Sequence, residues 1–464
     1  MFELTSSNAA FLIPGIIALL LLMGIFLRNV ISVFKKVLLP ASIIAGVIGF
    51  ILMNIGIIPI KQSVFETLAF HLTNLSFMSI TLSSVRKTKK DGIPKKDKAF
   101  RGGIWLAAMW GALFSIQVVV GGIVGVIVNK IGFSDFSGEL GTLNASAFAQ
   151  GPGQALAIGK TWESLGITGA AQIGLFYAAV GFLVASLVGV PICNILFKKK
   201  LTTFERKEQD IEMSKGLYAR ETEKKLGNQT THRASIDTLT THFAVLFGTY
   251  LFTYLLVTFL CKFIPTQAGK DSMYNMMFIW SIVVANIVKL IMQKFNCDNL
   301  IDSEVQSSIT NCLTDILLVS SMMSVSIGLI SKLIVPLLIV CIVITIVTAV
   351  VSFIMAKRTG EFFAERMITI FGFCTGTAVT GMLLLRVLDP AYKTSVAKEI
   401  VWWNILQMFA GLVVATAATL PTMGLTPWLI INIIVAILYL SIAFVIGENM
   451  SGKLVFKKNK KAIA

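Results

Sequence analysis

Two interrupted apolar stretches hold the polar residues best suited to binding a small solute. The first, AFAQGPGQALAIG at residues 147–159, has Gln150 and Gln154 on either side of a Gly-Pro-Gly centre. A helix cannot continue here, because proline removes a backbone donor and clashes with the preceding turn, while Gly151 and Gly153 leave the chain conformationally loose. An open backbone at membrane depth is tolerated only where protein buries it or water reaches it. The pattern indicates a polar-solute site; the alternative is a kink or a loop outside the membrane.

The second interruption is the CTGT sequence at residues 374–377, inside the apolar stretch 362–385. Gly376 and Thr377 offer backbone groups to a solute at this break. The hydroxyls of Thr375 and Thr380 either ligate a cation or bond back to helix carbonyls, and we favour ligation. Together the two breaks supply freed carbonyls and helix ends, which bind ions and carboxylates.

Asp315 places a carboxylate in the middle of an apolar helix, where it is costly unless paired, solvated or bound to a cation. Ser308 and Asn311 share its helix face by three- and four-residue spacing. This face predicts a sodium site that includes Asn311 and Asp315; the alternative is a structural hydrogen bond to a neighbouring helix. Arg386 either balances a substrate carboxylate or anchors its helix end at the membrane surface.

The composition places these stretches in a membrane. Of 464 residues, 55% are hydrophobic and 14% are charged, and the mean hydropathy is +0.81, which is more apolar sequence than a soluble core buries. The net charge of +16 comes from bases in short loops between apolar spans, as the positive-inside rule predicts, so we expect no nucleic-acid partner. The 6 cysteines lack the close pairs of a zinc or redox site. We expect free, buried thiols and no cofactor.

Windows of about 20 apolar residues predict the membrane spans. In the first half these fall at about 8–27, 40–60, 64–85, 102–128 and 167–197. In the second half they fall at about 242–263, 273–293, 301–330, 333–356 and 396–420, with one further span at about 426–446. Residues 198–240 are rich in charges of both signs and separate the halves as a linker.

Basic loops determine which side of the membrane each hairpin enters. The lysine-rich run 86–101 and the linker 198–240 are both predicted to be cytoplasmic, which places the N-terminus outside. An even number of crossings must lie between them, and two spans already supply that number. Residues 142–160 must therefore enter and leave on the outer side, as a re-entrant hairpin. The same parity argument makes 362–385 a hairpin that enters from the cytoplasm.

The predicted fold is an all-α polytopic membrane protein with an inverted-topology repeat. Residues 1–197 and 241–420 form the two repeats, each with five transmembrane helices and one re-entrant hairpin. Residues 421–464 add one C-terminal transmembrane helix and a basic cytoplasmic tail. This layout is typical of secondary transporters, in which two opposed hairpins meet near the midplane. Thr73-Asn74 and Thr310-Asn311, in corresponding spans, are a faint echo of the duplication.

The first break and the span after it, QGPGQALAIGKTWESLGITGAAQIGLFYAAVGFLVASLVGVPICNIL, resemble the first signature region of the bacterial sodium/glutamate symporter family. LLPASIIAGVIG in the second span and GTAVTGMLLLRVLDP at residues 376–390 extend the resemblance over most of both halves. The family pattern implies a homodimer in the bacterial cell membrane that takes up glutamate with sodium by an elevator-like movement. This sequence has AQGPGQ where the family more often has SGGHGT, which bears on the substrate more than on the fold.

Other function classes have less support. The sequence has no HExxH, GxSxG or P-loop motif, so we do not expect an enzyme, and Gly121-x-x-x-Gly125 predicts a helix-packing groove. The rivals are a passive channel, because broken helices also form selectivity filters, and a sodium- or proton-coupled transporter of another organic anion. The expected substrate-binding residues are Gln150, Gly151, Gly153, Gln154, Gly376, Thr377 and Arg386. The expected sodium ligands are Asn311, Asp315, Thr375 and Thr380.

Overall fold

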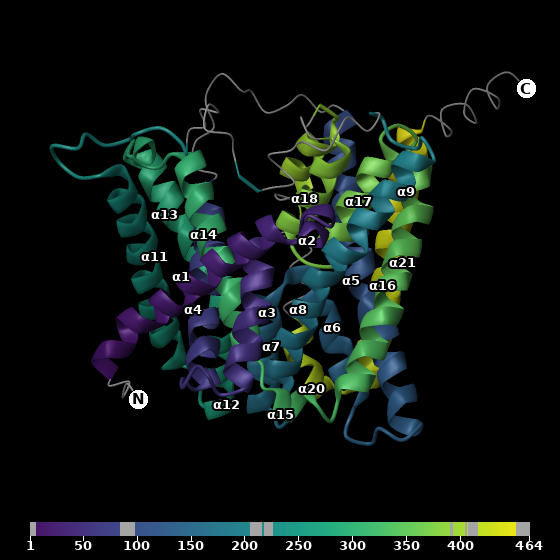
Figure 1. The fold of residues 1–464 in the computed structure, drawn as a ribbon, viewed down its shortest axis with the longest axis horizontal. Helices are drawn as coiled ribbons and strands as arrows, with labels where there is room; N and C mark the ends of the chain where they lie inside the picture. The colour runs from purple at the N-terminus through teal and green to yellow at the C-terminus, as the bar shows by residue number, and fades with distance from the viewer. Residues whose placement is uncertain are drawn as a thin grey trace, which may run out of the picture.

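In a computed structural model the chain forms a layered bundle of helices, with no strand among the described residues (Figure 1). The structure describes residues 6–83, 98–204, 216–217, 226–389, 393–403, 406 and 416–451. Most of the predicted basic run 86–101 lies outside these residues. The same holds for much of the linker 198–240, the middle of the span predicted at 396–420 and the basic tail.

The helices follow the predicted spans with local differences. In the first half they are α1 (Ser6–Val30), α2 (Ser32–Lys36), α3 (Ala41–Asn54), α4 (Gln62–Ser83), α5 (Lys98–Lys130), α6 (Gly138–Gln150), α7 (Pro152–Ser164), α8 (Ala170–Leu187) and α9 (Gly189–Lys198). In the second half they are α11 (Thr238–Cys261), α12 (Gln267–Asn275), α13 (Met277–Lys294), α14 (Ser303–Met323), α15 (Ile327–Ile330), α16 (Ile334–Ala356), α17 (Phe363–Phe373), α18 (Ala378–Leu388), α20 (Leu420–Met423) and α21 (Leu425–Met450). The second span is shorter than expected because Gly56, at φ +80°, turns the chain soon after Asn54.

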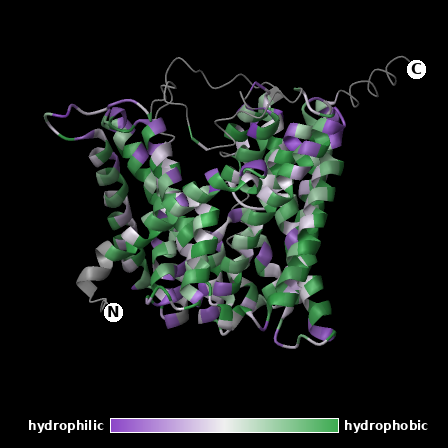
Figure 2. Cartoon of the chain, in the orientation of Figure 1, coloured by the Kyte–Doolittle hydropathy of each residue, from purple (hydrophilic) through white to green (hydrophobic). Residues whose placement is uncertain are grey.

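The outer helices present apolar side chains to their surroundings, as a membrane requires. On α16, Leu338, Ile342 and Ile346 are exposed at four-residue spacing, whereas the polar Thr345 and Thr348 are buried. Figure 2 shows hydrophobic residues along the lengths of the outer helices. Among the described residues, 7 helical segments are long and apolar enough to cross a bilayer. The chain is therefore a multi-pass, all-helical membrane protein.

The helices form two groups, and both halves of the chain contribute to each group. The α4/α14 group comprises α1, α3, α4, α11, α12, α13 and α14, in which α14 packs on α4 and α3. The hairpin group comprises α5 to α9, α16 to α18 and α21, in which α5 packs on α6 and α21. The groups meet mainly where α7 contacts α4 and α12, and where α8 contacts α14.

Close backbone packing fixes α5 against α6 within the hairpin group. A methyl group built on Gly121 would lie 2.3 Å from the Gly141 carbonyl oxygen, and one built on Gly125 would lie 2.9 Å from the Gly138 Cα. The predicted Gly121-x-x-x-Gly125 packing groove is thereby confirmed. Small residues at this spacing let two helix backbones approach closely, which gives the first break a rigid support.

Candidate functional site

The first break is a single residue wide. Helix α6 begins after Ser137, whose hydroxyl accepts a hydrogen bond from the Leu140 N–H, and ends at Gln150. Gly151 then takes φ +83° and ψ −174°, a conformation that L side chains rarely adopt, and Pro152 starts α7 in the first-turn position that tolerates its missing N–H. We call α6 and α7 hairpin 1. The sequence prediction of a helix break at Gly151 is confirmed.

The second break is wider and uses threonine. Helix α17 ends at Phe373 and α18 begins at Ala378. The Thr377 N–H donates to Thr380 Oγ1 at 2.8 Å, and that oxygen lies 2.8 Å from the Gly372 carbonyl and 2.7 Å from the Thr377 carbonyl. Thr375 Oγ1 donates to the Phe371 carbonyl at 2.9 Å. Both threonine hydroxyls therefore bond back to the chain, and only their remaining lone pairs are available to a cation. We call α17 and α18 hairpin 2.

The two breaks meet in space. A methyl group built on Gly151 would lie 2.7 Å from Thr377 Cγ2 and 3.7 Å from the Gly376 carbonyl oxygen. Helices α7 and α18 both begin at this contact, so two helix N-termini, with their free N–H groups and positive dipole ends, adjoin it. This arrangement attracts an anionic group such as a carboxylate.

Helix α5 closes the carbonyl ends of both breaks. The Trp110 indole Nε1 donates to the Ala149 carbonyl at 3.1 Å. The Gln117 amide donates to the Cys374 carbonyl at 2.8 Å and to Thr348 Oγ1 at 3.0 Å. Carbonyls freed at the end of a helix must find partners in an apolar interior. Sequence reasoning missed both residues, although a lone glutamine in so apolar a helix was a usable indication.

Several acceptor oxygens near the breaks remain without a hydrogen-bond partner among the described residues. They include the side-chain oxygens of Gln150 and Gln154, which flank the first break, and of Gln117, which adjoins the second. Buried acceptors of this kind favour a donor or a cation. Acceptor oxygens beside two helix N-termini suit a solute that carries both a carboxylate and an ammonium group, together with a small cation.

Hairpin 1 is also fastened to the α4/α14 group. A methyl group built on Gly153 would lie 2.2 Å from Thr73 Cγ2, so no side chain fits between α7 and α4 at this point. Farther along the same two helices, Lys160 Nζ lies 3.1 Å from Glu66 Oε1. Gly153 is therefore needed for close approach of the helices, which is the role that the sequence predicted for a glycine at this break.

Among the described residues, three predicted site residues make no hydrogen bond or ion pair with either break. Asn311 and Asp315 are exposed on α14, where the Asp315 carboxylate contacts the Ser42 side chain at the start of α3. Arg386 lies in the last turn of α18, nine residues after Thr377, which at 1.5 Å per residue is about 13 Å along the helix. Gln150, Gly151, Gly153, Gln154, Gly376, Thr377, Thr375 and Thr380 lie at or beside the breaks.

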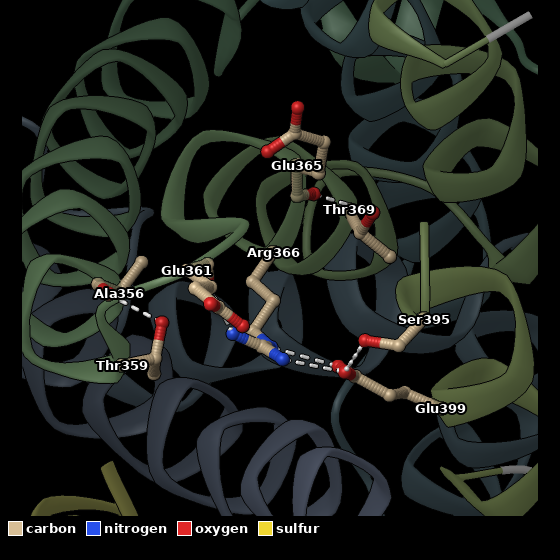
Figure 3. Close-up of polar contacts among 8 residues, drawn as sticks. All are labelled: Ala356, Thr359, Glu361, Glu365, Arg366, Thr369, Ser395 and Glu399. Carbon is tan, nitrogen blue, oxygen red and sulfur yellow. Dashed lines mark hydrogen bonds and ion pairs between the residues drawn. The ribbon is translucent and has the colours of Figure 1, made fainter. Parts of the chain in front are cut away.

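A buried ion pair anchors the first arm of hairpin 2 (Figure 3). The Arg366 guanidinium binds both oxygens of Glu399, through Nε at 2.8 Å and through Nη2, and Ser395 Oγ donates to the same carboxylate at 2.7 Å. Arg366 Nη1 also donates to the Glu361 carbonyl. A methyl group built on Gly102 of α5 would meet Glu399, so the pair is enclosed by backbone. Sequence reasoning did not find this pair.

Comparison with known families agrees with this architecture. The sequence model of a family described as sodium/glutamate symporter matches residues 11–394, which include both breaks and most of the helices. No curated protein and no solved structure matched the chain. The matched family consists of transporters and not of enzymes.

Proposed function

Because the chain belongs to the sodium/glutamate symporter family, we propose that it takes up glutamate or a related acidic amino acid in symport with sodium. Membrane transport coupled to sodium is the activity of the family. The observation that carries the proposal for this chain is the meeting of Gly151 with Gly376 and Thr377. Two helix N-termini there suit the substrate carboxylates, and the acceptor oxygens of Gln150 and Gln154 suit its ammonium group.

The proposed sodium site lies at the second break. Thr375 and Thr380 hold their hydroxyl oxygens there, and backbone carbonyls surround them. Small hard cations prefer such oxygen ligands, and discontinuous helices supply them in membrane transporters. The proposed site leaves out Asn311 and Asp315, because among the described residues neither side chain bonds to the second break, and leaves out Arg386, because it lies at the far end of α18.

Alternating access is proposed to occur by an elevator-like movement of the hairpin group against the α4/α14 group. Three features support the proposal: the two groups share few helix contacts, each half of the chain contributes to both, and the two hairpins lie in opposite halves of the molecule in Figure 1. These features are those of an inverted repeat with five helices and a hairpin in each half. We further propose a homodimer in the bacterial cell membrane, with the N-terminus outside.

Uptake by purified protein in liposomes tests the function. Labelled glutamate should accumulate above its external concentration when an inward sodium gradient is imposed, and accumulation should stop when the gradient is dissipated. A passive channel would only equilibrate the solute. Aspartate and dicarboxylates without an amino group, run in parallel, identify the substrate class, and accumulation of another anion but not of glutamate would refute the acidic amino acid.

Labelling of engineered cysteines tests the opposed hairpins. Thr168 lies in the exposed loop after hairpin 1, and Lys393 is exposed after hairpin 2. Thr168→Cys and Lys393→Cys, each in a cysteine-free background, should react with a membrane-impermeant reagent from opposite faces of the membrane. Reaction of both from the same face would contradict the inverted repeat.

A further inference from the structure

Charged residues lie on α4 and α7 and, in the other half of the chain, on α14 and α18. The first two helices are packed together, whereas the second two lack such packing. Glu66, Phe70 and Thr73 lie on one face of α4 by four- and three-residue spacing. They meet α7: Lys160 Nζ lies 3.1 Å from Glu66 Oε1 and 5.6 Å from the Phe70 ring centroid, and Thr73 packs on Gly153. The α4–α7 contact is therefore continuous from the ion pair to the break.

The corresponding faces of α14 and α18 carry exposed residues. On α18, Val379 is 49% exposed, and Arg386 is half-buried on the same face. On α14, Glu304 and Asn311 are exposed. Among the described residues, no ion pair joins α14 to α18, and the two helices lack the packing that α4 and α7 share. Figure 1 shows α7 in the lower half of the view and α18 in the upper half, on the side of α4 and α14 where the hairpin group lies.

The charged residues of the two helix pairs lie at related positions in the sequence. Lys160 lies nine residues after Gly151, and Arg386 lies nine residues after Thr377, its contact partner at the breaks. Glu66 precedes Thr73 by seven residues and Glu304 precedes Thr310 by six, so the two carboxylates lie in corresponding helical turns but about 100° apart around the helix axis. Thr73 and Thr310 are both buried, whereas Asn74 is buried and Asn311 is exposed. The basic residues thus recur at the same distance from the breaks, and the acidic residues recur in corresponding turns.

We propose that Glu66–Lys160 and Glu304–Arg386 are alternating ion-pair gates, the first closed in this structure and the second closing when the hairpin group moves to its other position. This inference rests on the proposed transport function and assigns to it four residues outside the solute site. Closure of the second gate buries Val379 of α18 against α14, as closure of the first buries Gly153 of α7 against α4. Each gate is a charge pair that forms in only one state and so biases the equilibrium between them.

Cross-linking tests the alternation directly. Glu66→Cys with Lys160→Cys, and Glu304→Cys with Arg386→Cys, are placed separately in a cysteine-free background and treated with a short bis-maleimide. Both pairs should cross-link, and each cross-link should stop uptake. A protein that carries all four substitutions should form either link but not both in the same molecule. Double cross-linking, or no cross-link at the second pair under any sodium and substrate condition, would overturn the proposal.

Charge exchange tests the partner of Arg386. Arg386→Glu and Glu304→Arg should each reduce uptake at least about tenfold through like-charge repulsion, and the double variant should recover to within about threefold of the parent. Absence of recovery in a folded, membrane-inserted double variant would reject Glu304 as the partner. The variants should bind substrate with unchanged affinity, which a merely structural defect at the breaks would not allow.

A matched control separates gating from stability. Arg358 and Glu448 form an ion pair of the same length, 3.1 Å, but both residues lie in the hairpin group. Lys160→Gln should increase the rate of cross-linking at the second pair about threefold to fivefold, as expected for loss of one partly exposed pair, whereas Arg358→Gln should not change it. Equal effects would contradict the proposal. Cross-linking rates are measured without transport. The gate proposal can therefore be refuted while sodium-driven uptake is observed, and the reverse.

Discussion

Hairpin 1 and hairpin 2 differ in how their second arms are covered. The α7 arm of hairpin 1 is packed on α4, and Pro152, Gly153, Leu156 and Ala157 are all buried. The α18 arm of hairpin 2 exposes Val379 and Met382. The same supersecondary unit is thus closed on one side of the molecule and open on the other. Under the proposed transport function we expect a site at the contact of two such hairpins to be shielded from one side only, which is the condition for alternating access.

The two breaks also differ in how the backbone is opened. Hairpin 1 uses one glycine at φ +83°, and hairpin 2 uses the four residues 374–377, after which Thr377 and Thr380 cap the second arm. The first arm of hairpin 2 is also held by the Arg366–Glu399 pair, and both of these side chains are almost completely buried. Hairpin 2 therefore combines a rigid first arm with an uncovered second arm, so we expect gating movement in α18 and not in α17.

The largest loss of stability is expected when one member of the buried Arg366–Glu399 pair is replaced. Arg366→Leu leaves the Glu399 carboxylate buried without its partner and should destabilise the protein by about 3–5 kcal/mol. The double variant Arg366→Leu with Glu399→Leu should recover most of that loss, because it removes the unpaired charge as well. Thermal unfolding of detergent-solubilised protein measures both. The partly exposed Arg358, changed to Leu, should cost less than about 1 kcal/mol, and equal losses in the single and double Arg366 variants would show that charge burial is not the cause.

Gly151→Ala and Gly376→Ala compare the two breaks directly. Alanine at the positive φ of Gly151 costs about 1–2 kcal/mol of backbone strain, and its methyl group would press on Thr377 at the meeting of the hairpins. Gly376 has no positive φ, and the atoms nearest to a methyl group there belong to the Thr380 side chain, with Oγ1 at 2.5 Å. Uptake should fall more than about tenfold in Gly151→Ala and less in Gly376→Ala. The opposite order would show that the threonine cap is the more constrained break.

A smaller effect is expected at the two donors of α5. Gln117→Leu leaves the Cys374 carbonyl without its partner and should cost about 1–3 kcal/mol. Trp110→Phe removes one indole donor from the Ala149 carbonyl and should cost about 1 kcal/mol. Unfolding of each variant measures these values. Substrate affinity should change in Gln117→Leu more than in Trp110→Phe, because Gln117 also adjoins the second break; a reversed ranking would assign the solute to the first break alone.

Local chemistry predicted the breaks, whereas distant contacts could not be predicted. Gly151 and Pro152 break a helix by themselves, so the sequence was sufficient to locate hairpin 1. The matched residues 11–394 confirm the predicted family. The Gln117–Cys374 and Arg366–Glu399 contacts join residues far apart in the chain, and no spacing rule indicates them. Of the predicted free, buried cysteines all are free, but Cys297 and Cys312 are exposed.

Asp315 shows why a polar residue in an apolar helix is ambiguous in sequence. Its cost at membrane depth predicted an ion ligand or a structural hydrogen bond. In the structure its side chain is exposed on α14 and contacts Ser42 at the start of α3. A carboxylate on a membrane helix can be stabilised by water or by a group that moves against it, just as it can be by a bound cation. No residue pattern within one helix distinguishes an ion ligand from a solvated carboxylate.

The smallest effect is therefore expected from Asp315→Asn. Substrate binding, measured by calorimetry across a sodium titration, should need a sodium concentration within about twofold of the parent value. Linkage requires that an ion which strengthens substrate binding is itself held more tightly when substrate is present. Thr380→Val removes a hydroxyl oxygen from the second break and should raise the sodium requirement and weaken that coupling. If the sodium titration of Asp315→Asn matches that of the parent and the titration of Thr380→Val is shifted to higher sodium, the ion binds at hairpin 2. Loss of sodium dependence in Asp315→Asn alone would instead place the ion on α14.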